Sequence, residues 1–373
     1  MKKSLRLVTT VEQGKRLVDE ILNRNHSQQI VLGLDCEGVR LGRFGRMSLM
    51  QLSQENNIFS LIDAKVEGVI ESFSPLLESE KLIKVMHDSR EDSSALFHQF
   101  NTRLKGVIDT QVASLLLQRD TKKKLIQESY GDLVARYCPE AEKMDNFSVD
   151  MKRKMLDDPF LWHQRPLSKQ LIDYAVNGVE HLIPIWREMS VIFDSTESHR
   201  AVLTASEAWV AYCEMNPELV QPNMVEKVGT PLLGMVAAIT DKGVYFKLNI
   251  GRTGVCSTPS ALKRMVLGAG NFPPVQVGDT VELAVSGISL DAKTVYVDRR
   301  DPDWEYFDFF RRPHPKKIDQ PGQEYRHVPS LVDGRKGADP LLRRGLGTDN
   351  AIDSDSDDEV DHEPILTHKP SRL

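Results

Sequence analysis

The chain has 373 residues, of which 40% are hydrophobic, and it carries a formal net charge of −6. This length exceeds one ordinary domain and favours two folded units with additional tails. No apolar run approaches the ~18–20 residues that span a bilayer, and the basic N-terminus is not followed by an apolar core with a cleavage site. We therefore expect neither a membrane protein nor a secreted one.

The cysteines and the distribution of charge narrow the class further. Four cysteines are scattered without a CxxC spacing, which predicts no zinc knuckle and no disulfide framework: Cys36, Cys138, Cys213 and Cys256. They favour a reducing compartment, the cytoplasm or the nucleus. Eight acids lie between Asp349 and Glu363, and the remainder of the chain carries +2 without them. Nucleic-acid binding would therefore depend on a local basic patch.

The first half of the chain alternates between predicted strands and helices. In chain order we expect a helix over 9–23 that begins at threonine caps, a strand over 30–35, strands over 47–52 and 57–63, a helix over 71–79, a strand over 82–87, a helix over 90–100, a helix start at 107–111 and helices to about residue 192. This order predicts an α/β fold in which helices cover a mixed sheet.

Two carboxylates follow the strand predicted at 30–35. Asp35 and Glu37 are two residues apart, so on a strand they project from the same face into one small volume. Like charges held this close repel each other unless a cation lies between them. The pattern indicates a metal site, and the alternative is a solvated pair of acids at a strand end.

Two further side chains are candidates for the same site. Asp92 lies at the start of the helix that follows the strand over 82–87, and ligands gather at such strand ends in α/β sheets. The alternative role for Asp92 is a first-turn acid stabilised by the helix dipole. Residues 162–184 predict an amphipathic helix with Tyr174 at its centre, where a tyrosine is more often part of the core.

Four ordered motifs together resemble one enzyme superfamily. They are Asp35-Cys-Glu37, His87-Asp-Ser-Arg-Glu-Asp92-Ser-Ser-Ala-Leu, Asp109-Thr-Gln, and Arg165-Pro-Leu followed by Tyr174-Ala. Over about residues 10–192 the chain resembles the tyrosine subgroup of the DEDD exonucleases, with ribonuclease D, the Werner syndrome exonuclease, Egalitarian and the exonuclease 3′–5′ domain-containing proteins. The resemblance implies a ribonuclease-H-like fold and hydrolysis of nucleic acid from its 3′ end by two Mg²⁺ or Mn²⁺ ions.

The resemblance also implies a role for each candidate residue. Asp35 would bridge both ions, Glu37 would hold the ion of the nucleophile, and Asp92 would serve the leaving-group ion through water. Tyr174 would orient the attacking water.

The fourth acid of the superfamily is missing from this sequence. The pattern places it four residues after the tyrosine, one helical turn further along the same face, and here that residue is Gly178. His181 shares the expected face but is a poor ligand for Mg²⁺. We therefore expect a site degraded to one ion, or a pseudo-nuclease, with weak or absent activity.

Residues 228–300 predict a small five-stranded β-barrel of the OB type. Strands are expected within 234–248, 249–256, 277–285 and 293–300, and their cadence resembles the RNA-binding repeat of ribosomal protein S-one. The resemblance implies that Tyr245, Lys247 and Arg252 bind nucleic acid. We expect Tyr245 to be exposed for base stacking and Phe246 to be buried. The alternative is that both rings pack.

The predicted organisation has four parts. Residues 1–195 form an exonuclease-like domain, 196–227 a helical linker, 228–300 the barrel, and 301–373 an aromatic segment followed by a largely disordered acidic tail. We expect an RNA-binding protein with weak or absent nuclease activity. The alternatives are an active Mg²⁺- or Mn²⁺-dependent 3′–5′ exoribonuclease, and a non-catalytic adaptor that binds a protein partner through residues 304–312.

Overall fold

A computed structural model of the protein describes residues 3–23, 29–119, 125–141, 145–268 and 273–300. The aromatic segment and acidic tail expected over 301–373 lie outside these residues. The chain divides into two compact units between Cys213 and Glu214, inside the range predicted as a linker. Among the described residues, no helix is both long enough and apolar enough to cross a membrane.

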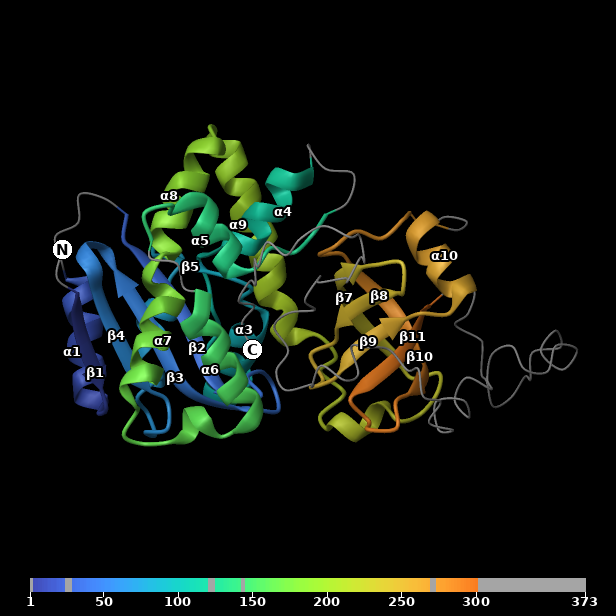
Figure 1. Ribbon diagram of the computed structural model, residues 1–373, viewed down its shortest axis with the longest axis horizontal. Helices are drawn as coiled ribbons and strands as arrows, with labels where there is room; N and C mark the ends of the chain where they lie inside the picture. Colours follow the sequence, from blue (N-terminus) through green and yellow to red (C-terminus); the bar gives the residue numbers. More distant parts are fainter. Residues whose placement is uncertain (1–2, 24–28, 120–124, 142–144, 269–272, 301–373) are drawn as a thin grey trace, which may run out of the picture. The chain divides into compact units, whose positions relative to one another are not determined.

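The first unit is built on a six-stranded mixed sheet with the strand order β1-β4-β3-β2-β5-β6 (Figure 1). Its strands are β1 Ser4–Val8, β2 Val31–Val39, β3 Arg46–Gln54, β4 Ile58–Asp63, β5 Ile83–Met86 and β6 Val107–Asp109. Strand β3 pairs antiparallel with both β2 and β4, whereas β1, β5 and β6 each join a neighbour in parallel. This confirms the mixed sheet expected from the sequence.

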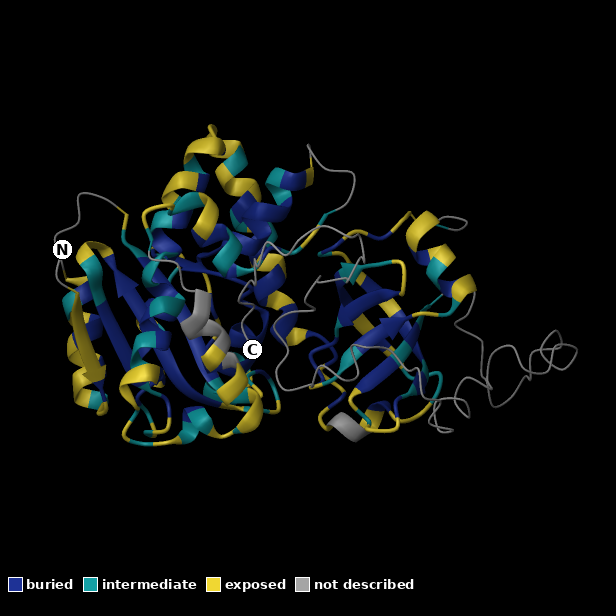
Figure 2. Cartoon of the chain, in the orientation of Figure 1, coloured by how far each residue is buried: buried dark blue, intermediate teal, exposed yellow. Residues whose placement is uncertain are grey.

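Helices pack on both faces of this sheet. On one face the core includes residues of α1 Val11–Leu22, α2 Ser74–Leu77 and α3 Arg90–Phe100. On the other it includes residues of α4 Thr110–Arg119, α5 Tyr130–Tyr137, α6 Asp145–Asp157, α7 Lys169–Glu180, α8 Leu182–Ile192 and α9 Thr196–Val210. The sheet interior is buried, while much of β1, at the edge, is exposed (Figure 2).

Most of these elements begin where local chemistry predicts. The side chain of Thr10 accepts a hydrogen bond from the backbone amide of Gln13 and so caps α1. Two expectations were wrong in detail. Residues 162–184 do not form one helix, because Pro166 disfavours helix in the residue before it and α7 begins only after the Ser168 cap. The expected helix start at 107–111 is preceded by strand β6, and α4 begins at Thr110.

The second unit contains a closed five-stranded barrel with the strand order β10-β11-β9-β8-β7. Its elements are β7 Pro231–Ile239, β8 Val244–Lys247, β9 Thr253–Cys256, α10 Pro259–Leu267, β10 Thr280–Ile288 and β11 Thr294–Arg299. Strands β9 and β11 pair in parallel, and the other neighbours pair antiparallel. This confirms the five-stranded barrel and is consistent with an OB-type fold.

Candidate functional site

Asp35 and Glu37 lie on β2, on the face that α7 covers. Alternate residues of this strand face opposite ways, and Leu34 and Cys36 belong to the core on the α1 side. Gly33 faces α7, because a Cβ atom there would lie 3.2 Å from the carbonyl oxygen of Val179. Asp35 and Glu37 are therefore directed together under α7, and only 1% and 7% of them is exposed.

Asp92 reaches this strand from the first turn of α3. Its Oδ1 atom accepts a hydrogen bond of 2.9 Å from the backbone amide of Cys36, the residue between the two acids. The β2–β5 ladder ends at the Gly33–Val85 pair, so β5 does not extend beside Cys36. Asp92 therefore supplies a partner where the neighbouring strand has ended.

The charge around Cys36 shows how closely the three acids lie. Burial is the largest cause that raises the pKa of the Cys36 thiol well above its ordinary value, followed by the charge of Asp92 and that of Asp35, with a smaller contribution from Glu37. This cysteine stays a thiol and is not a nucleophile, because nucleophilic cysteines have lowered pKa values.

Residues that the sequence patterns left without a role hold the turn between β5 and α3. Asp109 accepts hydrogen bonds from the backbone amides of Asp88 and Ser89, at 3.0 and 2.7 Å. Arg90 is fully buried, pairs with Asp88 at 2.6 Å, and lies 4.1 Å from the centre of the Trp209 ring. The residues from His87 to Arg90, together with Asp109, therefore position Asp92. In the sequence, only the occurrence of both motifs together could have suggested this role.

Helix α7 brings Gly178 against the first acid. The helix contacts β2, β3 and β4 and lies across the sheet in Figure 1. A Cβ atom at Gly178 would lie 2.7 Å from Oδ2 of Asp35. Tyr174, one turn earlier, is buried, and its ring packs against that of Trp162 with 5.9 Å between centroids. The structure thus brings together Asp35, Glu37, Asp92 and the helix of Tyr174.

The approach of α7 to the sheet is fixed at its N-terminal end by Arg165. Its guanidinium donates two hydrogen bonds of 2.7 Å to the carboxylate of Asp63 and one of 2.7 Å to the carbonyl oxygen of Ser48. Burial raises the pKa of Asp63, but the hydrogen bonds and charges of Arg165 and Lys65 together lower it below its ordinary value. Arg165 therefore has a structural role, in which its guanidinium holds the start of α7 against β3 and β4.

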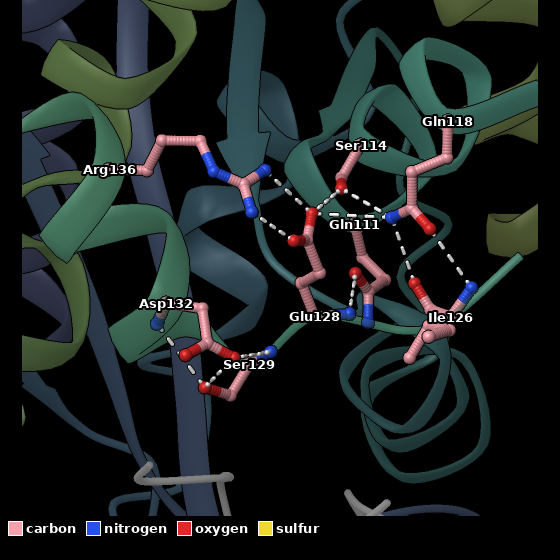
Figure 3. Close-up of polar contacts among 8 residues, drawn as sticks. All are labelled: Gln111, Ser114, Gln118, Ile126, Glu128, Ser129, Asp132 and Arg136. Atoms are coloured by element: carbon pink, nitrogen blue, oxygen red, sulfur yellow. Dashed lines mark hydrogen bonds and ion pairs between the residues drawn. The ribbon is translucent and has the colours of Figure 1, made fainter. Parts of the chain in front are cut away.

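A second polar network is centred on Glu128 and joins α4 to α5 (Figure 3). Glu128 accepts hydrogen bonds from Arg136, Gln118 and Ser114, and this holds the start of α5 against α4. On α5, Tyr130 donates a hydrogen bond of 3.1 Å to the carbonyl of Asn177, beside Gly178. The sequence patterns did not indicate this network, because glutamate and glutamine spacing in a loop has no specific signature.

The residues present do not fit the two-ion site that the resemblance implies. Gly178 offers no ligand at the fourth position, and among the described residues no three His, Cys, Asp or Glu side chains are grouped to hold a metal ion. His181 does not extend the Tyr174 face, because α7 ends at Glu180; it lines a cavity with Cys138 and Arg187. No hydrolytic step follows from this arrangement alone.

In the barrel, the structure contradicts the expected exposure of Tyr245. Tyr245 and Phe246 project to opposite faces of β8, but only 2% and 0% of them is exposed. Both faces of the strand are covered, so neither ring is a stacking platform. Lys247 is half-buried, and Arg252 pairs with Glu226 at 3.3 Å.

Comparisons with known proteins find relatives that match part of the chain. The Egalitarian protein homolog of Caenorhabditis elegans is 32% identical over 43% of this chain and 31% of its own length. Ribonuclease D of Nitrobacter hamburgensis is 32% identical over 33% of this chain and 28% of its own length. The mouse piRNA biogenesis protein EXD1 is 27% identical over 42% of this chain and 29% of its own length. The chain thus spans less than a third of the length of each of these curated relatives.

A solved structure and a family model are also similar to this chain. The crystal structure of Trypanosoma brucei RNase D is 21% identical, with a TM-score of 0.49, over 57% of this chain and 73% of that one. A family model described as 3′–5′ exonuclease matches residues 5–194, about half of the chain. Members of that family generally depend on divalent metal ions. The chain belongs to the 3′–5′ exonuclease family.

Proposed function

We propose that the chain binds RNA through its exonuclease-like unit and hydrolyses RNA weakly or not at all. The observation that carries this proposal is the position of Gly178, where the superfamily pattern places a carboxylate and where a Cβ atom would lie 2.7 Å from Oδ2 of Asp35. The substrate class comes from the relatives, which include ribonuclease D and a piRNA biogenesis protein.

The loss at position 178 should affect catalysis more than binding. In two-ion hydrolysis one ion generates the attacking hydroxide, and the missing carboxylate would help to hold that ion. Binding of a nucleic acid depends mainly on phosphate contacts made by basic side chains. A member of the exonuclease family with exposed basic side chains can therefore still bind RNA without the fourth carboxylate.

Asp92 has a structural role that does not depend on catalysis. Asp92 is fully buried and accepts the hydrogen bond from the Cys36 amide at 2.9 Å. Removing a partner from a buried backbone amide costs about 1–3 kcal/mol. The presence of Asp92 therefore does not by itself argue for an active enzyme.

The barrel contributes a second, smaller part of this proposal. Lys247, at the end of β8, and Arg252, in the loop before β9, are our proposed RNA contacts there. Lys247 is half-buried, and the side chain of Arg252 is only 8% exposed and pairs with Glu226, so Arg252 must leave that pairing and turn outward to reach a phosphate. Tyr245 has no exposed ring and is not part of the proposal.

A nuclease assay with 3′-labelled RNA and Mn²⁺ tests the loss of catalysis. We expect wild-type protein to shorten the RNA no faster than Asp35→Ala. Gly178→Asp should gain metal-dependent shortening, because it adds a carboxylate beside Asp35 where the superfamily pattern places the fourth acid. Asn177→Asp is the matched control, since it adds the same charge about 100° away around the helix. Shortening by wild type that disappears in Asp35→Ala would instead establish an active exoribonuclease.

Two measurements besides activity separate the remaining alternatives. Mn²⁺ should raise the melting temperature of Gly178→Asp more than that of wild type or Asn177→Asp, because four acids bind the ion better than three. A filter-binding assay should show RNA affinity that falls with salt. If wild type shows no such affinity, the adaptor function through residues 304–312 would be favoured.

A further inference from the structure

A bulge changes the direction of Arg46 at the rim of the acidic cluster. The β2–β3 register shifts between Glu37, which pairs with Leu49, and Gly38, which pairs with Met47. Bulges re-aim side chains near active sites. Met47 packs in the core on the α1 side, whereas Leu49 packs on the α7 side. Alternation then places Arg46 on the α7 side, the face of the acids.

Two other basic groups lie beside Arg46. Burial, followed by the positive charges of Lys65, Arg46 and Arg165, lowers the pKa of His163, while Asp63 acts in the opposite direction. The ammonium of Lys65 donates a hydrogen bond of 2.8 Å to the carbonyl oxygen of His163. We call Arg46, Lys65 and His163 the basic rim.

The charges of this rim remain available to a ligand. Arg46 and Lys65 are exposed. Across the described ranges, no salt bridge joins either of them to a carboxylate, whereas the nearby Arg165 is paired with Asp63 at 2.7 Å. Two exposed cations without a salt-bridge partner, beside buried carboxylates, favour an anionic ligand that lies over the site.

Exposed aromatic rings flank the basic rim. Phe160 is 59% exposed, and its carbonyl oxygen accepts a hydrogen bond of 2.8 Å from the amide of His163. Phe44 is 37% exposed in the loop that leads to Arg46, and the guanidinium of Arg43 lies 5.1 Å from its ring centre. Cations interleaved with exposed rings are typical of surfaces that bind single-stranded nucleic acid.

The loop that carries Arg43 and Phe44 is held in place by α3. Gln99 accepts a hydrogen bond of 2.9 Å from the amide of Met47 and donates one of 2.8 Å to the carbonyl of Gly42. Both ends of the loop are thus fixed to the same side chain. A fixed loop loses less conformational entropy when a ligand binds.

We propose that the basic rim and Phe160 bind a single-stranded nucleic acid, with the cations of Arg46 and Lys65 on its phosphates and the ring of Phe160 stacked on a base. The strand would then lie beside Asp35 and Glu37 on the α7 side of the sheet. This inference rests on the proposed RNA-binding function and names the surface that performs it.

Fluorescence anisotropy with a 5′-fluorescein-labelled single-stranded RNA of twelve nucleotides tests the rim on the full chain. Each phosphate contact contributes a slope of about −0.7 to log K against log salt, which is about fivefold in affinity at 0.1 M salt. We expect Arg46→Gln and Lys65→Gln each to weaken binding about fivefold and to reduce the slope by about 0.7. Phe160→Ala should weaken binding at least about fivefold with the slope unchanged.

Lys81→Gln is the matched control. Lys81 is an exposed lysine that precedes β5, at the opposite end of the sheet from Asp92, and its replacement should change neither affinity nor slope. If wild type binds RNA and the double variant Arg46→Gln/Lys65→Gln binds equally well with the same slope, the basic rim is not the binding surface, whereas the proposed RNA-binding function stands. If wild type shows no salt-dependent RNA binding, both the basic rim as a binding surface and the proposed RNA-binding function are contradicted.

If a variant folds poorly, photo-crosslinking of the wild-type protein tests whether RNA binds at the basic rim. RNA that contains 4-thiouridine should crosslink wild-type protein within residues 158–165, the segment of Phe160 and His163. Crosslinks confined to the barrel would overturn the rim as the binding surface.

Discussion

The two units each contain residues expected to form a functional site, and their outcomes differ. In the first unit, the amide of Cys36 joins Asp92 to the strand of Asp35 and Glu37 at 2.9 Å, and Gly178 lies against Asp35. In the barrel, the expected stacking ring of Tyr245 is only 2% exposed. Spacing along a strand or helix predicted which residues meet, but it did not predict whether a side chain on the outer face of a strand is exposed.

The difference has a physical cause. The acids are placed by strand alternation and by a backbone amide that needs a partner, both of which act over short distances. Exposure of an outer face depends on what the rest of the chain places over it. The following predictions test this contrast between a buried polar network and a buried ring, from the largest effect to the smallest.

Replacing Arg90 should have the largest effect. Arg90→Ala leaves Asp88 buried without its partner at 2.6 Å and removes the contact with Trp209. We expect the free energy of unfolding of the first unit to fall by about 4 kcal/mol, measured by urea denaturation. Arg16→Ala, at an exposed position of α1, is the control and should change it by less than about 0.5 kcal/mol. A loss for Arg90→Ala as small as that of the control would contradict the role of the network.

Replacing Tyr245 tests the buried ring in the barrel. Tyr245→Ala should destabilise the second unit by about 3 kcal/mol because it leaves a cavity, whereas Tyr245→Phe should cost less. RNA affinity of the folded variant should not change. Weaker RNA binding with unchanged stability would show that Tyr245 stacks on bases after all.

Lys84 allows a pH test in the first unit. Burial is the main cause that lowers its pKa from 10.5 to about 7, against the charge of Glu80. Between these values the unfolded chain holds a proton that the folded chain lacks, so stability rises with pH. We expect wild type to gain about 2 kcal/mol relative to Lys84→Met between pH 7 and pH 9, measured by urea denaturation. Parallel curves for the two proteins would contradict this expectation.

Asp63 should give the smallest effect, with the opposite dependence on pH. Its pKa is lowered in the folded chain, so the stability that it contributes is present above the ordinary pKa of about 4 and is lost as pH falls through the folded value. Asp63→Asn should cost about 1 kcal/mol at pH 7 and progressively less below pH 4. Glu67→Gln, which changes an exposed acid, should show no such trend. If Asp63→Asn lowers stability as much at pH 2 as at pH 7, the charge of Asp63 is not the origin of its contribution to stability.

Much of the fold could be predicted because its signals are local. The Thr10 cap, the apolar strand before Asp35 and the five barrel strands all appeared near their expected positions. Strand β6 was missed, because three residues of a parallel edge strand do not differ from the start of a helix in their apolar pattern. The single helix expected over 162–184 was wrong, because its periodicity continued across Pro166.

The sequence by itself determined that the acids share one face of β2 and that position 178 has no carboxylate, because side-chain direction repeats along a strand or helix. The tertiary structure decided that Gly178 lies against Asp35, that the bulge aims Arg46 at the same face, and that Tyr245 is covered. These properties depend on which elements pack together, and local periodicity carries no information about distant neighbours.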